Sequence, residues 1–184
     1  MIDDFTLVKK ANEGDGLAFS HLLERHYDLI YRLGFRMLQN RADAEDLTQD
    51  ICVSLAQKLR GFRGQSKLTT WLYQVTMNSA RDFLRRKATI SRIHRDFVDL
   101  EDLKKGAEAQ HKEDVEWAYE AINSMPESLR ETALLVVAEG LAHGEAGEIL
   151  DVKEATVSWR MMKVRDHLKA LAVGEANTNA EMRK

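Results

Sequence analysis

The chain of 184 residues has little of several features that other classes of protein need. It contains one cysteine, Cys52, which excludes an internal disulfide and a cysteine-based zinc site. One proline and 10 glycines are too few for a collagen-like, low-complexity or hairpin-rich β chain. The longest apolar run, residues 133–138, is far shorter than the ~20 residues of a membrane span. No signal peptide is visible, so we expect a cytoplasmic chain that makes no membrane contact itself.

The charge of the chain is small overall but unevenly distributed. A formal net charge of −3 does not by itself indicate a nucleic-acid binder. Residues 1–88 nevertheless carry 14 basic and 11 acidic side chains, whereas residues 114–184 carry 8 and 13. Between Lys58 and Lys87 eight basic residues accompany a single acid, Asp82. The first half of the chain therefore contains a local basic block of the kind that holds nucleic acid.

Apolar residues recur at helical spacing along the chain, and no strand-like alternation of useful length appears. The clearest stripes are Leu47, Ile51, Leu55 and Leu59; Val115, Ala118, Tyr119 and Ile122; and Val157, Met161, Val164, Leu168 and Leu171. The pattern predicts an all-α fold with two small helical domains, residues 1–88 and 114–172. Residues 89–113 are predicted to be a charged linker, and the small, polar residues 173–184 a disordered tail.

The second predicted domain has the spacing of a helix-turn-helix. Pro126 indicates a helix start, and the buried helix that follows is expected to end at Gly140. A short helix over 143–150, a tight turn at 151–152 and a longer helix from Glu154 follow, and such a last helix can enter the major groove. Its candidate DNA-contacting residues on one face are Thr156, Trp159, Arg160 and Lys163. A helical hairpin with a solvated face is the alternative.

The first predicted domain carries two contrasting surfaces. Its last helix aligns an aromatic ring, two amides and two guanidinium groups, which suit a single strand, in Trp71, Gln74, Asn78, Arg81 and Arg85. The alternative is that Trp71 belongs to the core. The preceding helix places Asp46, Asp50 and Gln57 on one side, an acidic patch that is either solvated or a dock for a basic protein. Asp43 and Asp46 fit N-cap and first-turn positions, whereas Asp50 lies too deep for that role.

Four segments, taken in order, resemble the extracytoplasmic-function (ECF) subfamily of sigma-70 RNA polymerase sigma factors. They are residues 13–19 (EGDGLAF), residues 43–50 (DAEDLTQD), residues 70–73 (TWLY) with Asn78, 80–82 and 84–86, and residues 125–127 (MPE) with 155–160 (ATVSWR). The resemblance covers roughly residues 5–88 and 114–171. It implies a transcription initiation factor that binds core RNA polymerase, recognises −10 and −35 promoter elements and promotes DNA melting.

The resemblance also implies roles for individual residues. Asp46, Gln49 and Asp50 would dock on the β′ coiled coil of polymerase. The loop that captures a flipped −10 base, and the helix that holds the melted strand, would include Arg60, Phe62, Arg63, Gln65, Ser66, Lys67, Trp71, Gln74, Asn78, Arg81 and Arg85. The −35 element would meet Lys153, Thr156, Ser158, Trp159, Arg160 and Lys163. Expected partners are core polymerase through its β′ coiled coil and β flap, promoter DNA, and an anti-sigma factor.

Some residues depart from the family pattern, and two other functions compete with it. Ser158 stands where the family has a basic residue, Trp159 and Met162 replace small or polar residues, and Gly144 replaces an acidic one. The −35 sequence should therefore be unusual. A helix-turn-helix regulator, or a sigma-mimicking adaptor that binds an anti-sigma partner without initiating transcription, is the alternative. An enzyme is not expected, because no His or acid pair has catalytic or metal-ligand spacing, and neither is a cofactor or metal.

Overall fold

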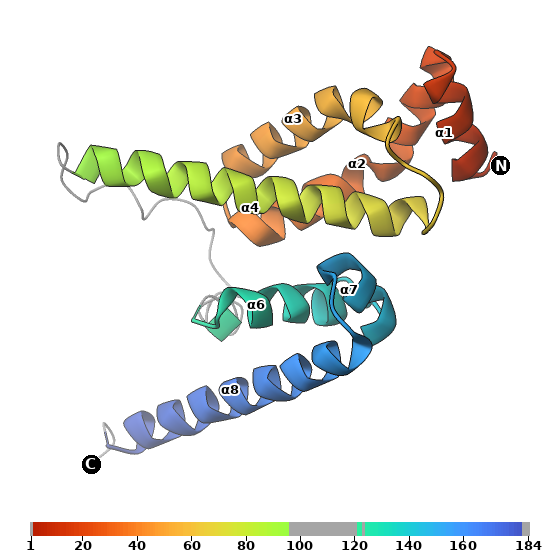
Figure 1. The fold of residues 1–184 in the computed structure, drawn as a ribbon. Coiled ribbons are helices and arrows are strands. Elements are labelled where there is room, and N and C mark those ends of the chain that lie inside the picture. The colour runs from red at the N-terminus through yellow and green to blue at the C-terminus, as the bar shows by residue number, and fades with distance from the viewer. Residues whose placement is uncertain (1, 96–120, 123, 182–184) are drawn as a thin grey trace. The chain divides into compact units, whose positions relative to one another are not determined.

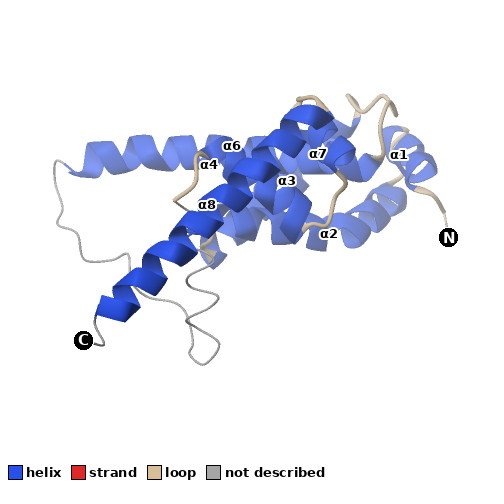
Figure 2. Cartoon of the chain, turned by 90° about the horizontal axis from the view of Figure 1, so that it is seen from below, coloured by secondary structure: helices blue, strands red, loops and turns tan. Residues whose placement is uncertain are grey.

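The computed structural model describes residues 2–95, 121–122 and 124–181, and it divides the chain into two compact units, Met1–Asp99 and Leu100–Lys184. The described residues are helical and contain no strand, which confirms the predicted all-α fold (Figures 1 and 2). Residues 96–120 lie outside the described part, and with them most of the predicted linker and the predicted stripe residues Val115, Ala118 and Tyr119. No helix in the described part combines the length and the apolar character needed to cross a membrane.

The first unit consists of α1 (Asp4–Asn12), α2 (Gly16–Leu38), α3 (Arg41–Leu59) and α4 (Leu68–Arg95). Helices α1, α2 and α3 each start at a polar side chain that accepts a backbone N–H, provided in turn by Asp3, Asp15 and Asn40. The predicted stripe of α3 is buried, with Leu47, Ile51, Leu55 and Leu59 each at most 2% exposed. These side chains pack with buried residues of α1, α2 and α4 in one apolar core.

The second unit contains α6 (Glu127–Ala133), η1 (Leu134–Ala138), α7 (His143–Leu150) and α8 (Glu154–Glu181). The predicted turn between the last two helices is present, because Asp151 ends α7 in the left-handed conformation at φ 54°. The helix predicted to end at Gly140 widens over its last turn into a π-helix, in which Glu139 N–H donates to the Leu134 carbonyl.

Two helices extend into segments for which the sequence predicts a linker and a disordered tail. Helix α4 continues to Arg95, past residue 88 after which the linker was expected to begin. Residues 89–95 include no Pro or Gly that would end the helix. Helix α8 continues to Glu181, into the segment expected to be disordered. Composition alone predicted disorder there, but a polar segment without proline can extend a helix that is already formed.

Candidate nucleic-acid and protein interfaces

Helix α3 presents a polar face to solvent on the side away from its buried stripe. Asp46, Gln49 and Asp50 are all exposed, as a docking surface requires. The helix begins at Arg41, because Asn40 Oδ1 accepts the Asp43 N–H at 3.0 Å. Asn40 is therefore the N-cap residue, a role that the sequence had suggested for an aspartate. Asp46 lies in the second turn of the helix. The helix terminus thus stabilises neither Asp46 nor Asp50.

Val53 belongs to the same face and was missed by the sequence reasoning. It follows Asp46, Gln49 and Asp50 at the i+7, i+4 and i+3 spacings that place side chains together on a helix. Its side chain is 85% exposed, although every apolar residue of the opposite stripe is buried. The sequence did contain a signal for Val53, because it is an apolar residue that lies outside the buried stripe of α3. We call Asp46, Gln49, Asp50 and Val53 the α3 face.

The loop of residues 60–67 joins α3 to α4 and is built on a tight turn. Gly61 N–H donates to the Lys58 carbonyl at 2.9 Å, and Phe62 N–H donates to the Leu59 carbonyl at 3.0 Å. The side chains that point into solvent from this loop are Arg60, Arg63, Gln65 and Lys67, while Phe62 and Ser66 are half-buried. The loop therefore combines cations, an amide and an aromatic ring within one short segment.

Phe62 and Trp71 bring the loop and α4 into contact. Their ring centroids lie 5.5 Å apart with an interplanar angle of 53°, a favourable tilted arrangement. Both rings pack against the edge of the apolar core, yet both remain only half-buried. One part of the Trp71 ring thus supports the core and another part stays open to solvent, and its contact with DNA stays a prediction.

The remaining predicted residues of α4 continue this surface along the helix. Arg81 Nη1 donates to Asn78 Oδ1 at 2.8 Å, and Arg85 lies 3.3 Å from the Asp82 carboxylate. Asn78 and Arg85 are exposed, while Gln74 and Arg81 are half-buried. These contacts are between exposed groups, where an ion pair contributes little stability and can be exchanged for a phosphate. Figure 1 shows α4 as one continuous helix that carries the whole stripe.

In the second unit, α8 exposes most of the predicted DNA-contacting residues. Trp159 is 55% exposed, Lys153 and Lys163 are exposed, and Thr156 and Arg160 are half-buried. Ser158 differs, because its Oγ lies 2.9 Å from His143 Nδ1 on α7. Ser158 is also two residues from Thr156, more than half a helical turn away. The structure therefore groups Thr156, Trp159, Arg160 and Lys163, while Ser158 links the two helices of the motif.

Helix α7 packs closely against the turn that leads to α8 and against the first residue of α8. A β-carbon at the buried Gly147 would lie 2.8 Å from the Val152 carbonyl oxygen, closer than two such atoms can approach. Gly144 has no such neighbour, since its β-carbon would stand 3.8 Å from Glu154 Oε2. Gly147 is therefore required by the helix-turn-helix geometry, and Gly144 is not.

The histidines form structural contacts rather than a reactive centre in the part of the chain described. His26 is buried, with Nε2 3.0 Å from Asp4 Oδ2. Burial lowers the pKa of His26, against the opposing effect of the Asp4 carboxylate. His143 contacts Ser158, as described above, and His21 is exposed. No group of three or more His, Cys, Asp or Glu side chains gathers to hold a metal ion among the residues described.

Known proteins resemble this chain over most of its length. Residues 22–90 match the sigma-70 region 2 family, a span that includes α3, the 60–67 loop and most of α4. The chain is 26% identical over 181 residues to the ECF RNA polymerase sigma-E factor of Haemophilus influenzae, covering 91% of this chain and 94% of that protein. It is 28% identical over 178 residues to the ECF RNA polymerase sigma-E factor of Escherichia coli strain K12, covering 90% and 92%. The chain therefore contains a sigma-70 region 2 and is similar along nearly its whole length to ECF RNA polymerase sigma factors. Its class of function is that of a transcription initiation factor.

Solved structures share the fold of this chain. CnrH, in complex with the cytosolic domain of CnrY, matches with a TM-score of 0.70 at 20% identity, covering 93% of this chain and 97% of that one. The sigma factor RpoE of Bartonella quintana, in complex with the anti-sigma factor NepR, matches with a TM-score of 0.67 at 22% identity, covering 84% and 96%. At these identities the likeness concerns the arrangement of the helices.

Proposed function

We propose that this chain is an ECF sigma factor that binds core RNA polymerase through the α3 face, recognises −10 and −35 promoter elements, and promotes DNA melting. The observation that carries the proposal is the combination of two surfaces in one compact unit. Helix α3 offers an acidic face with an exposed Val53, and the loop of 60–67 with α4 offers a basic, aromatic one. A regulator that only binds duplex DNA needs neither of them.

The α3 face suits a basic protein surface. Its two carboxylates lie one helical turn apart and are free of the helix N-terminus, so they are available to cations of a partner. Val53 adds an apolar group that gains free energy when a partner covers it. The occupant we propose is the β′ coiled coil of polymerase.

The loop and α4 suit the melted −10 strand. Half-open Phe62 and Trp71 rings offer stacking surfaces, while Arg60, Arg63 and Lys67 approach phosphates. A flipped base would bind at the loop, and the following bases along the face that carries Asn78, Arg81 and Arg85. Because these groups bind the open strand and not the duplex, binding shifts the duplex towards the open state. The factor melts DNA in this way without chemical catalysis.

Helix α8 is proposed to read the −35 duplex, and the second unit to meet the β flap. Its candidate contacts are Lys153, Thr156, Trp159, Arg160 and Lys163, with Ser158 holding the helix against α7. The acidic surplus of residues 114–184 opposes non-specific DNA binding, which depends on cations that meet phosphates. We therefore expect weak binding of the free chain to duplex DNA and strong binding within the polymerase complex, in the cytoplasm where the chromosome lies.

An anti-sigma factor is the further partner we propose. Both units expose apolar side chains on the surfaces assigned to polymerase and DNA, namely Val53 on α3 and Trp159 and Met162 on α8. A protein that covers these groups would block those contacts and would be held by apolar burial. The complex of RpoE with the anti-sigma factor NepR, whose fold this chain shares, supports this proposal.

A charge reversal on the α3 face tests the proposal. Asp50→Arg should weaken binding of the chain to purified core polymerase by about tenfold or more, because it replaces attraction with repulsion at the interface. The matched control is Asp28→Arg, which reverses an exposed acid on α2 and should leave core affinity unchanged. Both variants should unfold at the wild-type temperature.

The result also separates the competing functions. Equal core affinity of Asp50→Arg and the wild-type chain would contradict the role of the α3 face. If the wild-type chain itself binds an anti-sigma domain but opens no promoter with core polymerase, the chain is an adaptor or a regulator.

A further inference from the structure

Helix α1 lies beside the loop of 60–67, although 48 residues or more of chain separate them (Figures 1 and 2). The EGDGLAF segment of residues 13–19 joins α1 to α2, and both lie outside the α3 face and the loop. Two contacts connect α1 to the loop, one at the base of the loop and one at its tip.

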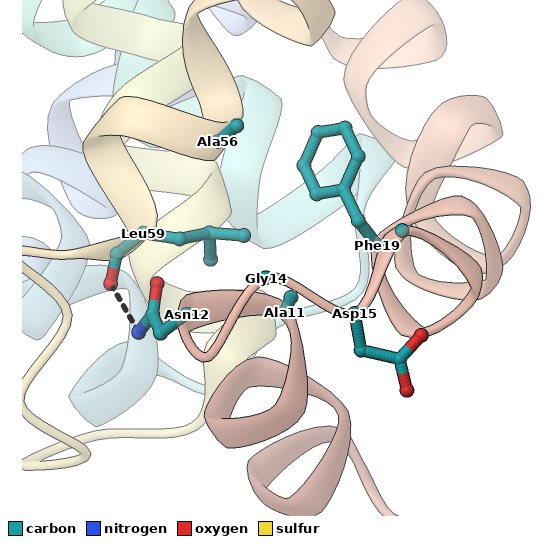
Figure 3. Close-up of a pocket in the computed structure, with 8 residues that line it drawn as sticks. Ala11, Asn12, Gly14, Asp15, Phe19, Ala56 and Leu59 are labelled. Atoms are coloured by element: carbon teal, nitrogen blue, oxygen red, sulfur yellow. Dashed lines mark hydrogen bonds between the residues drawn. The ribbon is translucent and has the colours of Figure 1, made fainter.

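The contact at the base involves Asn12, the last residue of α1. Its Nδ2 donates to the Leu59 carbonyl oxygen at 3.3 Å, as the dashed line in Figure 3 shows. The same carbonyl accepts the Phe62 N–H at 3.0 Å and so forms the turn that opens the loop. Asn12 therefore fixes the Leu59 carbonyl oxygen. The position of the Phe62 ring depends on this oxygen, because it accepts the Phe62 N–H.

Apolar packing does not replace that hydrogen bond. A cavity of about 200 Å³ separates the end of α1, the start of α2 and the end of α3 at this point (Figure 3). Asn12 and Leu59 line it, together with Phe19 and Asp15 of the EGDGLAF segment. The side-chain hydrogen bond spans this space and adds a directional polar contact to the apolar packing of α1 near Leu59.

The contact at the tip involves Phe5. A β-carbon at Gly64 would lie only 3.0 Å from Cε2 and 3.5 Å from Cδ2 of the Phe5 ring, so the ring lies directly against the glycine. Gly64 adopts φ +68°, a left-handed conformation in which other residues are strained. Phe5 is 65% exposed and so contributes little to the core.

Helix α1 is itself held firmly at the end that carries Phe5. The neighbouring Asp4 carboxylate pairs with Arg25 and with the buried His26, both on α2. Arg25 also donates to the Ile2 carbonyl at 3.0 Å. The first turn of α1 is thus fixed to α2, and Phe5 extends from this fixed turn to the loop.

We propose that α1 positions the −10 recognition loop, with Asn12 fixing its base and Phe5 its tip, and thereby sets how strictly one flipped base is selected. This inference rests on the proposed function. Selection of a base by hydrogen bonds needs a fixed loop, because donors and acceptors lose discrimination when they can shift to meet another base. Asn12 and Phe5 are positioning residues, since they act through the loop and not on the DNA.

The test uses holoenzyme assembled from purified core polymerase and each variant. It is mixed with fork-junction DNA whose single-stranded non-template segment has a randomised −10 region, and the bound DNA is sequenced. Phe5→Ala and Asn12→Asp should each reduce enrichment of the preferred base at the most selective position by about five- to tenfold. Core affinity should remain at the wild-type value, because neither residue lies on the α3 face.

Three controls separate positioning from a general loss of structure. Phe5→Tyr keeps the ring and should keep the selectivity, and Leu17→Ala removes an exposed apolar side chain of α2 and should change nothing. Phe5 is mostly exposed, so Phe5→Ala should unfold near the wild-type temperature. Wild-type selectivity in both Phe5→Ala and Asn12→Asp would overturn the inference. A wild-type holoenzyme that selects no base at any position would instead overturn the proposed function.

Discussion

Two glycines of α7, three residues apart, should respond in opposite directions to the same substitution. Gly144→Ala should stabilise the second unit by up to about 1 kcal/mol, because alanine favours a helix and the new methyl group meets only an ordinary contact at 3.8 Å. Gly147→Ala gains the same propensity but places its methyl group 2.8 Å from the Val152 carbonyl oxygen. A backbone atom cannot move aside as a flexible side chain can, so α7 and α8 must separate.

The difference between the two variants measures the steric cost alone, since the propensity gain is common to both. Overpacking of this kind costs about 1–3 kcal/mol, and we expect Gly147→Ala to be less stable than Gly144→Ala by that amount. Urea unfolding monitored by circular dichroism gives the total stability, and hydrogen exchange of peptides from α7 and α8 assigns the change to the second unit. A Gly147→Ala chain as stable as Gly144→Ala would refute the close packing of α7 against this turn.

Three further predictions concern the first unit. Trp71→Ala should destabilise the open complex by roughly 1–3 kcal/mol, the free energy of one stacked base, while closed-complex binding is retained. Permanganate reactivity of unpaired thymines detects the open complex. A large loss of thermal stability instead would indicate that the ring is purely structural. The pKa of His26 is lowered in the folded chain. Below about pH 6.5 the unfolded chain therefore binds a proton at this residue more readily than the folded chain does, and the free energy of unfolding should decrease as the pH decreases. His26→Leu should remove that part of the pH dependence between about pH 7 and 5, and an unchanged slope would contradict it. Burial raises the pKa of the Cys52 thiol, so a thiol reagent at neutral pH should label it far more slowly in the folded chain than in urea, and equal rates would refute this.

The sequence was a good guide wherever one helix face determines the outcome. The α3 stripe of Leu47, Ile51, Leu55 and Leu59 was predicted from spacing and is buried, because burial of an apolar stripe dominates the packing of a helix. Asp46 was misplaced within its helix because Asn40, three residues before Asp43, forms the cap, and several residues near that point could have capped it.

Contacts between distant segments could not be predicted. Asn12 and Leu59 are 47 residues apart, and nothing in their local sequence relates them. The contact of Phe5 with Gly64 and that of Ser158 with His143 arise in the same way, from tertiary packing of helices that periodicity identifies only one at a time. Val53 was overlooked for a different reason, because a single exposed valine has no periodic signal.

The most direct test of the whole account is transcription in a purified system. Core polymerase is supplied with genomic DNA fragments of the source bacterium and with wild-type chain, Asp50→Arg or Asp28→Arg, and the 5′ ends of the transcripts are sequenced. The account predicts defined start sites with wild-type chain and Asp28→Arg, preceded by common −10 and −35 elements, and loss of those transcripts with Asp50→Arg. Core polymerase that yields no defined start sites with the wild-type chain would contradict it.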